Sequence, residues 1–501
     1  MSRTKALIGD LIKYAPSQVV PALASLISIP ILTRLFPPQD YGRYMLVMAT
    51  ISVLTTLSGW LVMSVIRFYP ALERDGRLEE LYACVLVGVL IFVPTLAGLF
   101  TAIVFLARLK LEKFLHQLML VAVIVFSLTA IFEIFQSFLQ AKRKATWYSL
   151  FSTWKSGGGL VIGIGLVVVF RFGVEGLLWG SALNMALSLP LLWKIAIGRF
   201  PRIANFSAEL TKEMVKYSLP LVVGNLAAWV LSLSDRYILG FFRGAHEVGI
   251  YSASYAVSEK SILLLTTLFL LASGPISIHV WEKEGEQRAR EFVSSTMRYY
   301  LLLCLPAVVG LSVLARPAMG VLAGAAYYEG FRIMPFVALG GLLLGLQQRF
   351  QAGLIFYKKT HFIMVAMTCA GLINIGLNLL LVPRYGYIAA AITTLIGYTV
   401  LLAIMVISSK KYFIWDFPFA SLGRAVLASA IMGAIVYPVG NGLTSSPLLN
   451  LIVAVPLGAL LYFSLLFLLR EIQPNERRAL KQLIARHLPG RFTPASWKKT
   501  P

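Results

Sequence analysis

Long apolar runs alternate with short polar segments along almost the entire chain. A helix needs about 20 mostly apolar residues to cross the hydrocarbon layer, and in lipid its backbone polar groups must be paired within the segment. Runs of this length therefore predict an all-α integral membrane protein with about fourteen transmembrane helices. The predicted spans lie near residues 14–36, 44–66, 81–107, 115–140, 149–170, 175–197, 216–240, 250–275, 296–316, 333–356, 361–382, 386–408, 421–438 and 447–469.

The composition supports a membrane class and leaves little room for catalysis. Hydrophobic residues make up 58% of the chain, more than a water-soluble domain can bury. The segments between the spans are too short for an extramembrane domain, so we do not expect an enzyme. The three cysteines lie far apart inside apolar runs, and the five histidines are scattered over span ends and loops. Neither set has the spacing of a metal site, and no cofactor is expected.

The distribution of charge predicts the orientation. The chain has 45 Lys and Arg against 22 Asp and Glu, a net charge of +23. About two thirds of the basic residues lie in the even-numbered connections and at the two termini, and basic residues concentrate on the cytoplasmic side of membranes. Both termini are therefore predicted to be cytoplasmic, with an even number of crossings. This pattern explains the positive charge without a nucleic-acid partner.

The sequence contains an internal duplication with a period of about six spans. Gly158 and Gly163 match Gly371 and Gly376, 213 residues later. An even number of spans makes the two copies parallel repeats, which places the expected binding cavity between them near the midplane. The predicted organisation is a six-helix bundle over 1–200, a second six-helix bundle over 201–410, two additional transmembrane helices over 411–470 and a basic cytoplasmic tail over 471–501.

Three motifs carry a family resemblance: "LTRLFPPQDYGRY" at 32–44, "SDRYILGFFRGAHEVGIYSAS" at 234–254 and "PRYGYIAAAITT" at 383–394. Together with the number of spans, they resemble the polysaccharide transporters, the Wzx-like O-antigen or capsule repeat-unit flippases of the multidrug/oligosaccharidyl-lipid/polysaccharide exporter superfamily. The resemblance implies a protein of the bacterial inner membrane that moves an undecaprenyl-pyrophosphate-linked oligosaccharide to the periplasmic leaflet. It further implies alternating access coupled to an ion gradient, for the biosynthesis of O-antigen, capsule or exopolysaccharide.

The alternatives that stay open are a lipid II flippase, a multidrug or small-molecule antiporter of the same superfamily and, less favoured, a membrane-embedded glycan polymerase or ligase. The expected partners are the lipid-linked glycan and membrane lipid, with a polysaccharide polymerase and chain-length machinery as further candidates. The long periplasmic loop expected of a polymerase or ligase does not occur in the sequence.

Charged side chains inside the spans are the first candidates for a site, because a charge in the hydrocarbon layer usually faces a cavity or a partner. Lys260 and Arg349 lie well inside predicted spans, and Arg34 and Arg236 lie toward the periplasmic ends of equivalent helices. Such cations would bind an anionic pyrophosphate. For the two arginines, snorkelling to the interface is the alternative, and it is the preferred interpretation of Lys155.

Acidic and amide side chains complete the candidate set. Glu259, Asp235 and Glu133 are candidates for ion coupling. The substrate-binding candidates also include three amides, Gln136, Gln351 and Asn225, which could bind sugar hydroxyls or pack against neighbouring helices. Glu133, Gln136 and Gln140 fall at i, i+3 and i+7, so they share one helix face.

Overall fold

A computed structural model of the protein describes residues 16–472 and residue 476. The first helices are α2 (Pro16–Leu35), α3 (Pro38–Arg74), α4 (Leu78–Leu106), α5 (Lys113–Ala141), α6 (Ala145–Val168) and α7 (Glu175–Ala196). They are followed by α8 (Ala208–Arg243), α9 (Ala245–Glu284), α10 (Glu286–Val313), α11 (Ala315–Leu322), α12 (Met334–Phe356), α13 (His361–Lys410), α14 (Phe419–Gly442) and α15 (Pro447–Leu468). Three short 3-10 helices are η1 (Ala107–Leu109), η2 (Ile203–Asn205) and η3 (Ala325–Ile333).

The helices follow the predicted spans closely, and each of the fourteen predicted ranges coincides with a helix over its described residues. Within the described part of the chain, eleven helices are long and apolar enough to cross a membrane. One of them, α13, is 50 residues long and carries two predicted spans. Helices α2 and α9, at the first and eighth predicted spans, are not among the eleven. The all-α membrane fold expected from the hydropathy pattern is confirmed.

Helix α13 is a hairpin of two arms rather than one rod. Gly386 has φ 60° and ψ −144°, a backbone conformation that residues other than glycine rarely adopt. The helix is interrupted at this residue. Asn378 accepts a hydrogen bond from Thr393 (2.8 Å), which lies only 15 residues further along the chain. This contact requires the second arm to run back along the first. The predicted eleventh and twelfth spans are therefore the two arms of α13.

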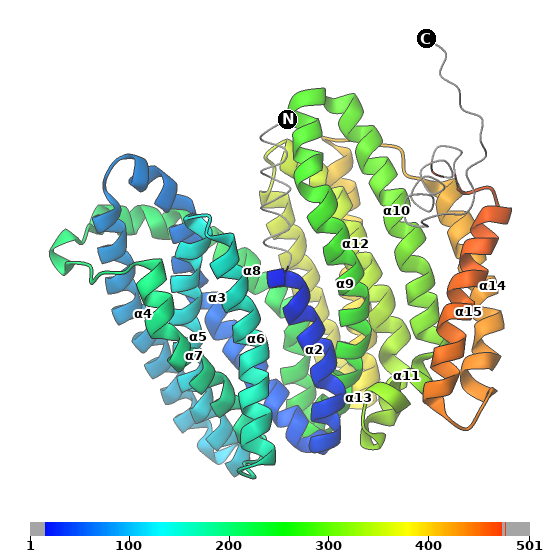
Figure 1. The fold of residues 1–501 in the computed structure, drawn as a ribbon, viewed down its shortest axis with the longest axis horizontal. Helices are drawn as coiled ribbons and strands as arrows, with labels where there is room; N and C mark the ends of the chain where they lie inside the picture. Colours follow the sequence, from blue (N-terminus) through cyan, green and yellow to red (C-terminus); the bar gives the residue numbers. More distant parts are fainter. Residues whose placement is uncertain (1–15, 473–475, 477–501) are drawn as a thin grey trace, which may run out of the picture.

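Two groups of helices form the molecule (Figure 1). Helices α3–α7 gather on one side and α9–α15 on the other, with α2 between them and α14 and α15 at the outer edge. Helix α3 packs against α8 and α9, and α14 packs against α10. The division into two repeats and two added helices stays a prediction, and all of the predicted basic tail except residues 471, 472 and 476 lies outside the described residues.

The largest apolar cluster joins the two groups at one end of the molecule. It includes Phe36 and Tyr41 at the α2–α3 turn, Val248 and Tyr251 at the start of α9, and Tyr327 of η3. Tyr327 donates a hydrogen bond to the Phe36 carbonyl oxygen (2.8 Å), which ties η3 to the α2–α3 turn. The two helix groups are therefore packed together at this end, and the space between them lies further along the helices.

Candidate substrate cavity

A cavity of about 780 Å³ lies between the two groups of helices. Helices α2, α3, α5, α6 and α7 form one wall, and α8 and α9 form the other. It extends from Tyr41 and Tyr44, beside the sealed end, to Gln140 and Tyr148 at the α5–α6 turn. The charged side chains among its lining residues are Glu133, Lys155, Arg236, Glu259 and Lys260.

Arg236 of α8 is held firmly at the cavity wall. Its Nη1 donates hydrogen bonds to Asp235 Oδ1 (3.0 Å) and to the Ser232 carbonyl oxygen (2.8 Å), and its guanidinium lies 4.9 Å from the ring centre of Tyr255. Asp235 is only 1% exposed and also accepts hydrogen bonds from Tyr251 and from Thr394 of α13. The neighbouring carboxylate compensates the arginine charge, which could not otherwise remain buried at low cost.

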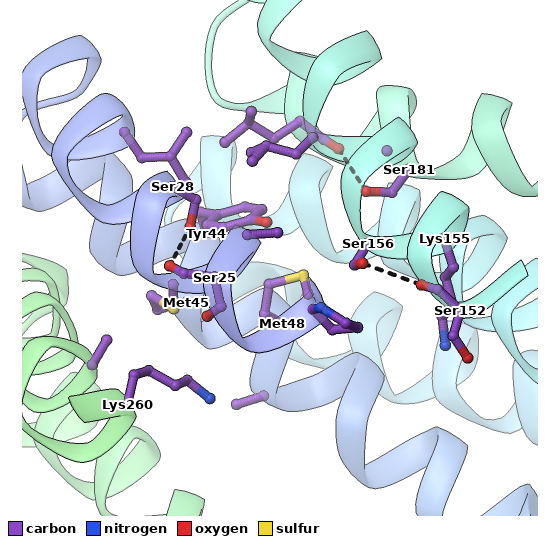
Figure 2. Close-up of a pocket in the computed structure, with 18 of the residues that line it drawn as sticks. Ser25, Ser28, Tyr44, Met45, Met48, Ser152, Lys155, Ser156, Ser181 and Lys260 are labelled. Atoms are coloured by element: carbon purple, nitrogen blue, oxygen red, sulfur yellow. Dashed lines mark hydrogen bonds between the residues drawn. The ribbon is translucent and has the colours of Figure 1, made fainter. Parts of the chain in front are cut away.

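Lys260 of α9 is less constrained than Arg236. The nearest carboxylate oxygen that pairs with its Nζ is Glu259 Oε2 at 4.0 Å, and the side chain is 31% exposed. Figure 2 shows Lys260 extending from α9 toward side chains of the opposite wall. A lysine ammonium with this freedom is suited to follow an anionic group that moves through the cavity.

The wall across the cavity from Lys260, formed in part by α5 and α6, is polar, and its charged side chains pair with each other. Lys155 Nζ of α6 donates a hydrogen bond to Glu133 Oε1 of α5 at 2.6 Å. Gln136 Nε2 donates to Ser152 Oγ (2.7 Å) and to the Tyr148 carbonyl oxygen (3.1 Å). Ser152, Lys155 and Ser156 face the same space in Figure 2. The sequence interpretation placed Lys155 at the interface. In the structure Lys155 lines the cavity. Tyr148, Ser152 and Gly159 also line it and lie at helical spacing from Lys155, and this spacing was the signal that could have placed Lys155 in the cavity.

The sealed end of the cavity depends on two glycines, each the fifth residue of its helix. A Cβ on Gly42 of α3 would lie 1.8 Å from the Ala245 carbonyl oxygen, and a Cβ on Gly249 of α9 would lie 1.9 Å from the Pro38 carbonyl oxygen. Gly42 precedes Tyr44 and Gly249 precedes Tyr251 by the same two positions. Only glycine permits two backbones to approach this closely. The starts of α3 and α9 therefore close the cavity at this face.

The predicted site residues separate into two sets. Gln136, Arg236, Lys260, Glu133 and Glu259 line the cavity, and Asp235 supports it from behind Arg236. The remaining four, in the part of the chain that the structure describes, do not line it: Arg34, Arg349, Gln351 and Asn225.

The two arginines outside the cavity have other contacts. Arg34 is exposed and donates hydrogen bonds to the carbonyl oxygens of Pro30 (2.8 Å) and Val321 (2.7 Å), which joins α2 to α11. Arg349 is buried in the second helix group, where Nη1 donates to Ser273 Oγ (2.8 Å) and the guanidinium lies 5.1 Å from the ring centre of Phe269. Gln351 is half-buried on α12 and Asn225 is exposed on α8. Within the described residues, no group of three His, Cys, Asp or Glu side chains could hold a metal ion.

The family model of polysaccharide biosynthesis proteins matches residues 31–332, more than half of the chain. The protein belongs to this family. Two curated relatives are the probable low-salt glycan biosynthesis flippase Agl15 of Haloferax volcanii, 23% identical over 66% of this chain and 68% of its own length, and the succinoglycan biosynthesis transport protein ExoT of Rhizobium meliloti, 22% identical over 62% of both chains.

Solved structures share the fold of this polysaccharide biosynthesis protein. The lipid II flippase MurJ in an inward closed conformation superposes with a TM-score of 0.76 at 17% identity, covering 93% of this chain and 99% of that chain. An inward-facing multidrug resistance MATE family transporter gives 0.64 at 13% identity, over 79% and 94%. The chain is thus a multi-pass membrane protein of the polysaccharide biosynthesis family, with the fold that these solved structures share.

Proposed function

We propose that the protein is a flippase that moves an undecaprenyl-pyrophosphate-linked oligosaccharide repeat unit from the cytoplasmic to the periplasmic leaflet of the bacterial inner membrane. Its product would feed the biosynthesis of a cell-surface polysaccharide. The family match supports the glycan, and the relatives Agl15 and ExoT carry glycan biosynthesis in their names. Both termini would be cytoplasmic, because the basic residues concentrate on that side.

The observation that carries this proposal is the position of Lys260. It lines both the large cavity, which carries the charged and hydroxyl side chains described above, and a smaller pocket of about 220 Å³ between α2 and α9. The smaller pocket is otherwise mostly apolar, lined by Val19, Pro21, Leu263 and Leu264 among others. In a lipid-linked glycan, the pyrophosphate lies between the isoprenoid chain and the sugars. A cation where a polar and an apolar space meet matches that order of groups.

The sealed end favours transport by alternating access. The Gly42 and Gly249 contacts close the face that the charge distribution predicts to be periplasmic. The cavity continues to Gln140 and Tyr148 at the α5–α6 turn, on the predicted cytoplasmic side. We infer that the substrate headgroup enters from the cytoplasmic leaflet in this state, and that separation of α3 from α9 releases it on the other side.

For ion coupling we favour Asp235 and, second, Glu259. The Asp235 carboxylate is buried, compensates Arg236 and receives a hydrogen bond from Thr394 of α13 (3.3 Å). A proton or cation bound to this carboxylate would weaken its attraction for Arg236 and free the guanidinium for the pyrophosphate. Binding of the ion and of the substrate would in this way be linked.

The test uses the purified full-length protein in proteoliposomes that contain undecaprenyl pyrophosphate carrying a short oligosaccharide. Flipping is measured as the rate at which the glycan becomes sensitive to a membrane-impermeant glycosidase. We expect Lys260→Met to lower this rate at least about tenfold, because one charge-assisted contact to phosphate is lost. Lys283→Met, at the far end of the same helix, is the matched control and should retain the wild-type rate.

Two results would overturn the proposal. One is wild-type protein that fails to flip this lipid but flips lipid II or exchanges an organic cation. The other is a Lys260→Met variant that flips the lipid-linked glycan as fast as the Lys283→Met control.

A further inference from the structure

The cavity wall that α5, α6 and α7 contribute to carries polar side chains whose presence is not explained by binding of a pyrophosphate. On α5, Glu133, Gln136 and Gln140 line the cavity from one helix face, and on α6 Ser152 and Lys155 do the same. Ser181 adds a hydroxyl from α7. We define these six residues as the amide–hydroxyl wall.

The charges in the amide–hydroxyl wall cancel. Lys155 and Glu133 form an ion pair at 2.6 Å, so the wall offers no net positive charge to an anion. The two cations that are better suited to phosphate, Arg236 and Lys260, lie on α8 and α9 across the cavity. Figure 2 shows Lys260 on one side of the space and Ser152, Lys155 and Ser156 on the other. The cavity therefore has two chemically different walls.

The ion pair is also a poor candidate for a purely structural contact. The side chains of Lys155 and Glu133 are 27% and 36% exposed, and ion pairs with this much exposure contribute little to stability. A carboxylate, an ammonium, an amide and hydroxyls on one surface instead supply both hydrogen-bond donors and acceptors. Sugar hydroxyls, which donate and accept at once, are chemically complementary to such a surface.

We propose that the amide–hydroxyl wall is a sugar subsite, in which the Glu133–Lys155 pair and Gln136 bind hydroxyls of an uncharged sugar of the glycan. This inference rests on the proposed function. It assigns Glu133 to the recognition of sugar in place of ion coupling, and it brings in Lys155 as a binding residue. The substrate would lie across the cavity, with its pyrophosphate at Lys260 and Arg236 and its sugars at α5 and α6.

Paired ligands separate this subsite from the pyrophosphate site. Binding to the full-length protein in nanodiscs is measured for undecaprenyl pyrophosphate and for the same lipid carrying a neutral trisaccharide. We expect Glu133→Gln and Lys155→Met to weaken binding of the glycosylated lipid about tenfold, because each variant loses a charged hydrogen-bonding group. Binding of the bare lipid should remain within about twofold of wild type. Lys260→Met should weaken both lipids.

A charge-swapped variant, Glu133→Lys with Lys155→Glu, distinguishes recognition from structural support. It keeps an ion pair between α5 and α6 but exchanges the donor and acceptor positions, so we expect binding of the glycosylated lipid to stay weak in a folded protein. Glu291→Gln, which removes an exposed ion pair with Arg288 outside the cavity, is the matched control and should bind both lipids like wild type.

Several outcomes would overturn the subsite: wild-type binding by the single variants, equal weakening of both lipids, or recovery in the charge-swapped variant. Tighter binding of the glycosylated lipid by Glu133→Gln would also overturn it, because the carboxylate would then not contribute to recognition of the sugar. Failure of the proposed function is detected separately, in the flipping assay, because wild-type protein would then not flip the glycosylated lipid whatever the subsite variants do to its binding.

Discussion

At the scale of single residues, the contact between Asp235 and Arg236 shows how a charge is kept beside a membrane cavity. Neighbouring helical residues point in directions about 100° apart, so adjacency in the sequence does not by itself pair two side chains. In the structure the long arginine side chain turns back, and Nη1 lies 3.0 Å from Asp235 Oδ1. The two side chains are 8% and 1% exposed. A buried pair of this kind depends on both partners, because either one alone is an uncompensated charge.

We therefore expect Asp235→Asn to destabilise the protein by about 3 kcal/mol, since it leaves the Arg236 charge buried without a carboxylate. The double variant Asp235→Asn with Arg236→Gln should regain most of this loss, because neither charge remains. Thermal unfolding of the detergent-solubilised protein measures both effects. If the double variant unfolds at a temperature no higher than Asp235→Asn alone, the two side chains do not compensate each other.

At the scale of helices, the starts of α3 and α9 meet through backbone atoms, with glycine in the equivalent position of each helix. The contact is reciprocal: Gly42 lies against Ala245, and Gly249 lies against Pro38. The contact itself is between backbones, with the buried rings of Tyr41 and Tyr251 in the cluster around it, and its separation would open this face of the cavity. Elsewhere on α3, Gly59 has no neighbouring atom within 4 Å of the position that a Cβ would take.

Adding a methyl group at this contact should hold the gate apart. Overpacking typically costs about 1–3 kcal/mol, which shifts an equilibrium between two states by roughly 5- to 150-fold. We expect Gly42→Ala to increase labelling of a cysteine introduced at Ser28, a cavity residue, by a membrane-impermeant reagent added at the predicted periplasmic face. The measurement requires a background in which Cys84, Cys304 and Cys369 are replaced. The Gly42→Ala substitution should also slow flipping of the lipid-linked glycan.

The alanine variant of Gly59 on the same helix is the control, and it should label like the parent protein. The corresponding substitution on α9 is Gly249→Ala, which should also increase labelling. Its control is Gly274→Ala, because a Cβ at Gly274 also has no neighbour within 4 Å. Equal labelling of Gly42→Ala and Gly59→Ala would mean that the backbone contact does not control access.

At the scale of the whole molecule, the last two helices, α14 and α15, are fastened to α10 by a buried carboxylate. Glu471, directly after α15, is 2% exposed and accepts hydrogen bonds from Arg298 Nε of α10 (2.6 Å), Ser421 Oγ (2.6 Å) and Arg424 Nη1 (2.8 Å) of α14. Burial by itself raises the pKa of this carboxyl, but the hydrogen bonds from Ser421, Arg424 and Arg298 outweigh it and hold the pKa below the usual value of 4.5.

Because the pKa of Glu471 is lowered in the folded protein, its contribution to stability is present above about pH 4.5 and is lost as the pH falls through the folded value. We expect Glu471→Gln to destabilise the attachment of α14 and α15 at neutral pH, seen as faster proteolysis at the α13–α14 connection. The difference from wild type should shrink below pH 4.5. A difference that stays unchanged as the pH falls progressively below 4.5 would show that ionisation of Glu471 is not what fastens the helices.

The hydropathy pattern alone predicts which segments are helices and that the chain spans a membrane. Apolar runs of the length of the hydrocarbon layer leave the backbone few other solutions, so the predicted spans and the observed helices coincide. Charges inside the spans, such as Lys260 and Arg236, were also visible, because a charge is costly in lipid wherever it lies.

The direction in which each polar side chain points could be seen only once the helices were packed together. The sequence predicts three similar intramembrane or interfacial cations, Arg34, Arg349 and Lys260. In the structure Arg34 binds a backbone carbonyl of α11 and Arg349 is buried among α9 side chains. Of the three, Lys260 lines the cavity. Helical periodicity fixes the relative directions of side chains on one helix but not the rotation of that helix against its neighbours. That rotation is set by packing between segments far apart in the chain, and it turns Lys155 toward Glu133 in the cavity.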